Sequence, residues 1–197
     1  MTHTLHRQGT ADNLENDYLI IGLPNVQLPD FRGKMERFYE ICLKHGPVNH
    51  KSSVAWRIYV FGSKEKVTSV LKDMIDAQLG LSIVVSGLYD QVEDCCHGVG
   101  IKPHTINYSL GFWGNKDKLP LKNILEITTM CGHGLISPNL VSDMAEKVAK
   151  GLPVADATEE IAKCCVCDIV NGKRCKQLLN KIAEDIESGK LDISKSP

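Results

Sequence analysis

Short apolar runs alternate with stretches of helical periodicity through the first half of the chain. The runs are rich in β-branched and aromatic residues and are bounded by glycine, proline or polar residues, which is typical of strands. They predict strands at residues 17–22, 54–61, 81–85 and 105–110. Helices are predicted between the strands, at residues 32–45, after Gly62-Ser63, and from Ser86-Gly87 to about His97.

The alternation of strands and helices also predicts the fold class. Short connections favour an α/β fold with a mostly parallel sheet and flanking helices, because parallel neighbours need a crossover element between them. We assign residues 18–114 to this α/β core. A ferredoxin-like α+β fold with an antiparallel sheet is the alternative, since it uses similar elements and the pattern does not encode the strand order.

The last part of the chain has a different character. Residues 115–197 contain no long strand pattern, and helix signals dominate. Ser137-Pro138 is a typical helix start, with a capping hydroxyl followed by a proline in the first turn. Asn171 can cap a further helix that runs from Gly172 to Glu187. Residues 1–17 are polar and are expected to form a segment on the surface.

The charge balance narrows the classes of partner. The chain has 197 residues, 43% of them hydrophobic, and 23 Lys and Arg stand against 24 Asp and Glu. A chain of this size can bury a full core. Without an excess of positive charge, neither nucleic acid nor an anionic membrane is a favoured partner. The N-terminus shows no apolar segment of signal-peptide type and no run reaches transmembrane length, so a cytoplasmic protein is expected.

Five of the 8 cysteines lie between residues 131 and 175, and they point to a metal or thiol site. Cys131 and His133 precede the helix predicted at Ser137, while Cys165 and Cys167 lie in a turn between two predicted helices. Thiolate and imidazole are ligands that zinc and iron prefer, and residues at i and i+2 of a turn can reach one metal. We therefore expect all four to form the ligand set, with the three sulfur atoms roughly 4–7 Å apart.

The remaining cysteines and histidines are weaker candidates. Cys164 is expected to point away from the site, and Cys175, one helical turn into the next helix, is a reserve ligand. The pair His3 and His6 could extend toward a metal but is more typical of solvated terminal residues. Cys95, Cys96 and His97 lie at the end of a predicted helix, where packing of one cysteine and exposure of the next is the simpler interpretation. Cys42 is expected in the core.

Several interpretations of the cysteine cluster stay open. With Cys164 expected to point away, the predicted ligand set contains no C-x-x-C pair. This favours an iron–sulfur cluster, such as the 4Fe–4S type, over zinc, although one histidine with three cysteines is also an ordinary structural zinc shell. Thiol redox or sulfur-carrier chemistry, with Cys165 or Cys167 as nucleophile, requires no metal. Cysteines that only fill the core are the remaining alternative. No catalytic residue is assigned, since the chain has no serine-triad, Walker or zinc-protease signature.

Three stretches of the chain resemble a family of small, uncharacterised cysteine-containing proteins of anaerobic bacteria and archaea. They are His3-Thr4-Leu5-His6-Arg7, residues 125–134 (LEITTMCGHG) and Cys165-Val166-Cys167. The resemblance covers nearly the whole chain but implies no fold, substrate or ligand set. The chain departs from the pattern at Cys164, Asp168 and Cys175, which argues against Cys175 as a ligand.

These observations predict a cytoplasmic metalloprotein of anaerobic redox metabolism. The helical segment would bind an iron–sulfur cluster that serves electron transfer with a redox partner protein or cluster-assisted chemistry on a small-molecule substrate. A structural zinc site in an interaction or regulatory module is the second interpretation. A thiol redox enzyme or sulfur carrier is the third.

Overall fold

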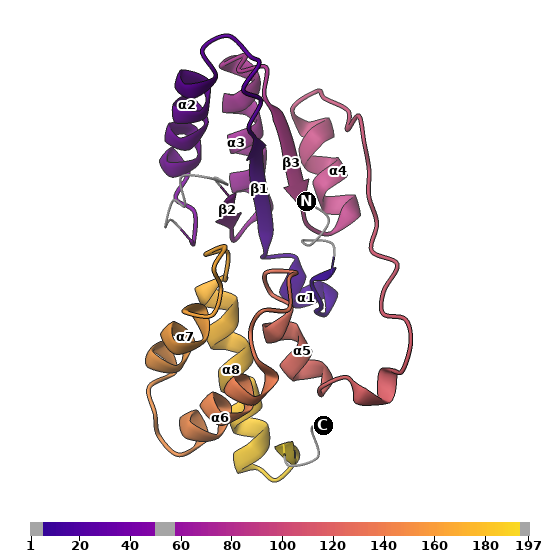
Figure 1. Cartoon of the computed structure of the whole chain (residues 1–197), viewed down its shortest axis with the longest axis vertical. Coiled ribbons are helices and arrows are strands. Elements are labelled where there is room, and N and C mark those ends of the chain that lie inside the picture. Colours follow the sequence, from indigo (N-terminus) through magenta and orange to yellow (C-terminus); the bar gives the residue numbers. More distant parts are fainter. Residues whose placement is uncertain (1–5, 50–57, 194–197) are drawn as a thin grey trace. The chain divides into compact units, whose positions relative to one another are not determined.

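The computed structural model of the chain describes residues 6–49 and 58–193 (Figure 1). It divides into two compact units, each built from separate parts of the sequence. The first, here called the α/β unit, holds residues 10–106 and 167–171. The second, here called the helical unit, holds the described residues 6–9, 107–166 and 172–193. Each unit therefore contains residues from near both ends of the chain.

The α/β unit consists of a small sheet and four helices. Its elements are, in order, α1 (Ala11–Leu14), β1 (Tyr18–Leu23), α2 (Phe31–Lys44), β2 (Ile58–Phe61), α3 (Lys64–Asp76), β3 (Ser82–Ser86) and α4 (Tyr89–Gly98). The strand order is β2-β1-β3. Both pairings of the central strand β1 are antiparallel, with Ile20 opposite Tyr59 in β2 and opposite Val85 in β3.

The prediction of a mostly parallel sheet is wrong, because both strand pairs in the described sheet are antiparallel. The reason lies in the strand order. β2 and β3 do run in the same direction, as their connection through helix α3 requires, but β1 lies between them and runs the opposite way. A crossover helix therefore joins strands that are not neighbours. The alternation of strands and helices in the sequence does not distinguish this arrangement from a parallel sheet.

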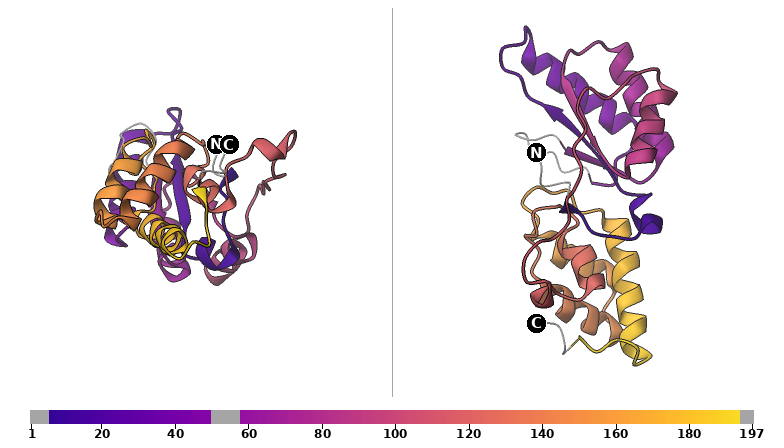
Figure 2. Two further views of the ribbon diagram at one scale, coloured as in Figure 1. Left: turned by 90° about the horizontal axis from the view of Figure 1, so that it is seen from below. Right: turned by 90° about the vertical axis from the view of Figure 1, so that its right-hand side faces the viewer.

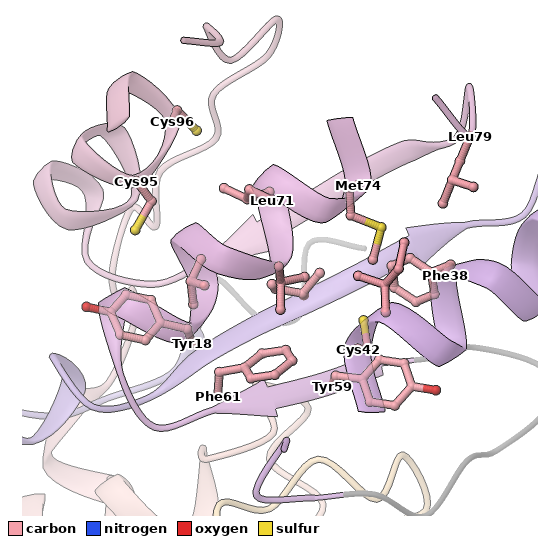
Figure 3. Close-up of a cluster of buried hydrophobic side chains, with 14 of the residues drawn as sticks. Tyr18, Phe38, Cys42, Tyr59, Phe61, Leu71, Met74, Leu79, Cys95 and Cys96 are labelled. Carbon is pink, nitrogen blue, oxygen red and sulfur yellow. The ribbon is translucent and has the colours of Figure 1, made fainter. Parts of the chain in front are cut away.

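The core of the α/β unit lies between one face of the sheet and the helices (Figure 3). Tyr18 and Ile20 of β1 point to this face, since side chains two apart in a strand share a face. They pack with apolar side chains of the other elements, namely Met35, Phe38, Ile41, Cys42, Tyr59, Phe61, Val67, Val70, Leu71, Met74, Leu79, Cys95 and Cys96. The ring centroids of Phe38 and Tyr59 are 5.7 Å apart. Cys42 is buried here, as expected, and burial raises the pKa of its thiol far above the ordinary range.

Two of the four predicted strands are matched only in part or not at all by the strands that the structure describes. Residues 105–110, predicted as a strand, form no strand in the structure and are exposed throughout. Of the predicted strand at residues 54–61, the structure contains Ile58–Phe61 as β2, and the part from 54 to 57 lies outside the described residues. The other two predicted strands correspond to β1 and β3 with shifts of one residue at their ends.

The helical unit is organised around its longest helix. It contains a short 3-10 helix (Lys116–Lys118) followed by α5 (Lys122–Thr128), α6 (Pro138–Ala149), α7 (Val154–Ala162) and α8 (Gly172–Glu187). α8 packs against α5, α6 and α7 (Figure 2). Its buried residues, which include Cys175, Leu178, Leu179 and Ile182, recur at intervals of three and four and so share one face.

Ser137 stands at the N-cap of α6 with Pro138 in the first turn, as predicted, although its hydroxyl makes no capping hydrogen bond. Among the described residues, none of the helices combines the length and the apolar character that a membrane crossing requires.

Candidate thiolate site

Three of the four predicted ligands belong to the helical unit. Cys131 and His133 lie in the loop between α5 and α6, and Cys165 lies in the turn that follows α7. That turn continues the helix for a residue or two, since the Cys165 N–H donates to the carbonyl of Ala162 at 2.9 Å. The fourth, Cys167, begins the short segment Cys167–Asn171, which belongs to the α/β unit.

Cys131 has the most unusual environment of the cysteines. Hydrogen bonds lower the pKa of its thiol from 9.0 to about 5, the largest effect coming from the side chain of Cys165. Burial opposes this shift, and the backbone N–H groups of His133 and Leu135 and the side chain of His133 act in the same direction as Cys165. These donors stabilise the charged form and therefore favour the thiolate of Cys131, with the side chain of Cys165 as the largest contributor.

The two glycines of Cys131-Gly132-His133-Gly134 explain how the backbone reaches the sulfur. Gly132 has φ 78° and Gly134 has φ 65°, a left-handed conformation that costs other residues about 1–2 kcal/mol. Successive turns of this kind direct neighbouring N–H groups toward one point and create an anion-binding concavity. Here the N–H groups of His133 and Leu135 both donate to the Cys131 sulfur. The loop is thus shaped to hold a negative charge at Cys131.

The thiolate and its main donor are shielded from solvent. Cys131 is 0% exposed and Cys165 is 5% exposed, whereas His133 lies at the surface. A buried charge is costly unless it is paired or coordinates a metal. The hydrogen-bond donors around the Cys131 sulfur offset part of this cost.

Other cysteines of the helical unit are not held in this way. Cys175 is fully buried in α8, and burial raises the pKa of its thiol to about 12 despite a hydrogen bond with Thr158. It is therefore a neutral thiol of the helix interface. Cys164, next to Cys165, is half-buried. The pKa of Cys131 is lowered, which favours the thiolate, whereas the pKa values of Cys42, Cys96 and Cys175 are raised by burial.

The structure brings together part of the predicted ligand set. Cys131 lies in hydrogen-bonding contact with Cys165 and with the side chain of His133. Within the ranges 6–49 and 58–193, no group of three or more His, Cys, Asp and Glu side chains has the geometry of a metal site. The convergence of the Cys167 sulfur with the other two stays a prediction. None of the eight cysteines, all of which lie in these ranges, is joined to another by a disulfide.

Residues Cys167–Asn171 are anchored within the α/β unit by amide side chains. Asn49 Nδ2 donates to the carbonyl oxygens of Asp168 at 2.7 Å and of Ile58 at 3.3 Å. Asn171 Nδ2 donates to Asp17 Oδ1 at 3.1 Å and to the carbonyl oxygen of Asn16 at 3.2 Å. The capping role of Asn171 stays a prediction, and the two bonds tie the segment to the residues just before β1. These bonds fix the backbone that carries Cys167.

Sequence reasoning missed Asn49, because an amide beside a strand carries no signal for a partner more than a hundred residues away. Asn49 is 7% exposed, and the N–H of Val60 donates to its Oδ1.

Replacing Asn49 by alanine is expected to release residues 167–171. The variant leaves the Asp168 carbonyl and the Val60 N–H without their amide partner, and buried groups deprived of a hydrogen bond cost about 1–3 kcal/mol each. Native-state hydrogen exchange should show faster exchange at Ile169 and Val170, both buried, than in the wild-type protein. Asn25→Ala, at an exposed turn, is the matched control. Unchanged protection of Ile169 and Val170 would show that the anchor lies elsewhere.

Further residues of the helical unit support the loop that carries Cys131. The N–H of Gln8 donates to Thr129 Oγ1 at 3.0 Å, and buried Arg174 donates to the carbonyl oxygen of Gln8 at 2.7 Å. Thr129 Oγ1 in turn donates to the carbonyl oxygen of Leu125 at 2.6 Å. The segment after His6 is therefore fastened two residues before Cys131. The sequence offers no signal for these contacts beyond the proximity of Thr129 to the motif.

The weaker candidates stay outside this site. His6 is exposed, and His3 lies outside the described residues. Packing of one of the two cysteines is confirmed, but the predicted exposure of the next is wrong, because Cys95 and Cys96 are both buried in the core of the α/β unit (Figure 3). His97 is exposed near the end of α4.

No protein-family model, curated protein or solved structure matches this chain.

Proposed function

We propose that the protein binds a metal centre through the thiolate of Cys131 and the sulfur of Cys165, with His133 at its exposed side. The observation that supports this most strongly is the loop of Cys131 to Leu135, where two backbone N–H groups and a second cysteine hold a negative sulfur out of water. A metal cation is the partner that neutralises such a charge without opening the fold. Hydrogen bonds from N–H groups to ligand sulfurs also tune bound metals and iron–sulfur clusters.

An iron–sulfur cluster is the metal centre we propose first. Cys131 and Cys165 supply two thiolates, and Cys167 follows Cys165 at i+2, so that the chain itself keeps its Cα within about 7 Å of Cys165. His133 as a fourth ligand would resemble the mixed ligation that raises cluster potentials. Such a centre serves one-electron transfer with a redox partner protein or binding of a small-molecule substrate. Zinc on the same ligands is the alternative metal, in a structural or regulatory role.

A second candidate function is dithiol redox chemistry, which the contact between Cys165 and Cys131 favours. A thiolate next to a thiol can close to a disulfide with loss of one proton and two electrons to an acceptor. The burial of both residues restricts this chemistry, since a bulky disulfide substrate cannot reach the Cys131 sulfur. For that reason we place it after metal binding.

Anaerobic purification distinguishes the candidates. We expect iron and acid-labile sulfide in the purified protein, together with visible absorption that bleaches on reduction. A colourless protein with one equivalent of zinc would support the alternative metal. A protein free of both metals after expression in iron- and zinc-supplemented medium, with all thiols titratable by a small disulfide reagent, would contradict metal binding and support dithiol chemistry.

A further inference from the structure

Thr129 fixes the start of the turn that carries Cys131. It follows the last residue of α5, and its carbonyl oxygen accepts a hydrogen bond from the Gly132 N–H at 2.7 Å. This bond closes a four-residue turn in which Cys131 is the third residue. The N–H groups of His133 and Leu135, which donate to the Cys131 sulfur, follow directly after the turn. The position of Thr129 therefore helps to set where the sulfur and its donors lie.

The hydroxyl of Thr129 is bound by the N-terminal segment of the same unit. The Gln8 N–H donates to Thr129 Oγ1 at 3.0 Å, and the Gln8 carbonyl oxygen accepts from Arg174 Nη2 at 2.7 Å. Both contacts use the backbone of Gln8, which thereby joins the end of α5 to α8. Thr129 is 7% exposed and Arg174 is 2% exposed. Hydrogen bonds that are shielded from water in this way are costly to lose.

We propose that Thr129 and Arg174, acting through the backbone of Gln8, are positioning residues of the thiolate site. Arg174 holds the Gln8 carbonyl, the Gln8 N–H holds the Thr129 hydroxyl, and Thr129 holds the turn of Cys131. The inference rests on the proposed function where it concerns bound metal, whereas the effect on the loop itself requires no metal. Groups that orient a metal ligand without touching the metal change metal affinity by about 10–100-fold, which sets the size of the effect to expect.

The same contacts couple the N-terminal segment to the occupancy of the site. If release of Gln8 weakens metal binding by a given factor, metal binding must strengthen the attachment of Gln8 by the same factor, because coupling between two binding equilibria is reciprocal. The N-terminal segment is therefore a part of the thiolate site that responds when the site is filled.

Thr129→Val tests the proposal, since it removes the hydroxyl and keeps the shape of the side chain. In the metal-free protein, the amides of His133 and Leu135 should exchange about fivefold faster, which is the effect of one ordinary hydrogen bond on a local opening. The anaerobically purified variant should bind its metal at least about tenfold more weakly in competition with a chelator. Thr129→Ser keeps the hydroxyl and should restore both values. The amide of Leu179, in the core of α8, should exchange as in the wild-type protein.

Thr128→Val is the matched control. Thr128 is the last residue of α5, is 4% exposed, and its hydroxyl donates to the Leu125 carbonyl oxygen at 3.4 Å, the same oxygen that Thr129 Oγ1 reaches. The control should leave metal affinity and the exchange of His133 and Leu135 unchanged. Equal effects of the two variants would overturn the proposal, because the bond to Leu125 would then account for both. Unchanged exchange in Thr129→Val would overturn it as well.

Metal loading of the wild-type protein gives a second measurement that needs no variant. Exchange at the Gln8 amide should slow at least about tenfold when the site is filled. A Gln8 amide that exchanges equally with and without metal would contradict the coupling. A wild-type protein that binds no metal would contradict the proposed function instead, and the exchange of His133 and Leu135 in metal-free Thr129→Val would still decide whether Thr129 positions the thiol.

Discussion

Cys131→Ala is expected to lose the bound metal and to lower the stability of the helical unit. Loss of partners that only orient a ligand weakens metal binding by about 10–100-fold, so loss of this ligand should exceed about 100-fold. Because metal binds the folded state, a loss of that size removes about 2.7 kcal/mol or more of stabilisation under saturating conditions. Metal content per chain and the thermal unfolding midpoint of the anaerobically purified protein measure the two effects.

Cys175→Ala is the matched control for that experiment. Cys175 is as buried as Cys131, but burial raises its thiol pKa to about 12, so it has no thiolate to offer a metal. The control should lose some stability through the cavity in the α8 interface and should keep its metal. Equal metal content in both variants would show that Cys131 is not a metal ligand and only fills the core.

The metal-free protein should become more stable as the pH rises from about 5 to about 9. The pKa of Cys131 is about 5 in the folded protein and near 9.0, the ordinary thiol value, when the chain is unfolded. A lowered folded-state pKa gives stabilisation that is complete above the unfolded pKa and is lost as the pH falls through the folded one. The slope is at most about 1.4 kcal/mol per pH unit, because one proton is involved.

Urea unfolding with chelator and reductant, compared at about pH 6 and about pH 8, measures this slope. The other titrating groups change the free energy of unfolding equally in the wild-type protein and in Cys131→Ala. The difference between the two pH profiles therefore reports on the Cys131 thiol and its partner Cys165. Cys165→Ala should reduce the difference, since the Cys165 side chain is the largest cause of the lowered pKa. Parallel pH profiles for wild type and Cys131→Ala would show that Cys131 is a neutral thiol in the folded protein.

The local elements of the fold could be predicted from the sequence, whereas the sheet could not. Tyr18–Leu23 and Ser82–Ser86 carry dense apolar runs, and Ser137-Pro138 marks a helix start through its own chemistry. The antiparallel order depends on which strand is inserted between two others, and this is decided by packing between distant segments. Residues 105–110 show the reverse case, where a strand pattern exists without a sheet partner in the same structure.

The candidate site was predictable in its residue types and only partly in its geometry. The spacing of Cys131 and His133, with Cys165 in a second turn, indicated that the two loops converge, and the sulfur contact between Cys131 and Cys165 agrees with that expectation. The N–H donors to the Cys131 sulfur come from the glycine-rich loop itself. Left-handed φ values at Gly132 and Gly134 create that arrangement, and glycine in a sequence permits such values without requiring them.

Protein synthesis proceeds from the N-terminus, and the interleaving of the two units therefore sets the order in which the molecule can be completed. The α/β unit draws on residues 167–171, whose hydrogen bonds reach Asn49 and Asp17. When the ribosome has produced the first hundred residues, the sheet can form, but this closing segment does not yet exist. Cys131 likewise emerges well before Cys165. The thiolate site therefore cannot form before Cys165 has been made, and fragments cut between residues 106 and 107 would separate sequences that each unit needs.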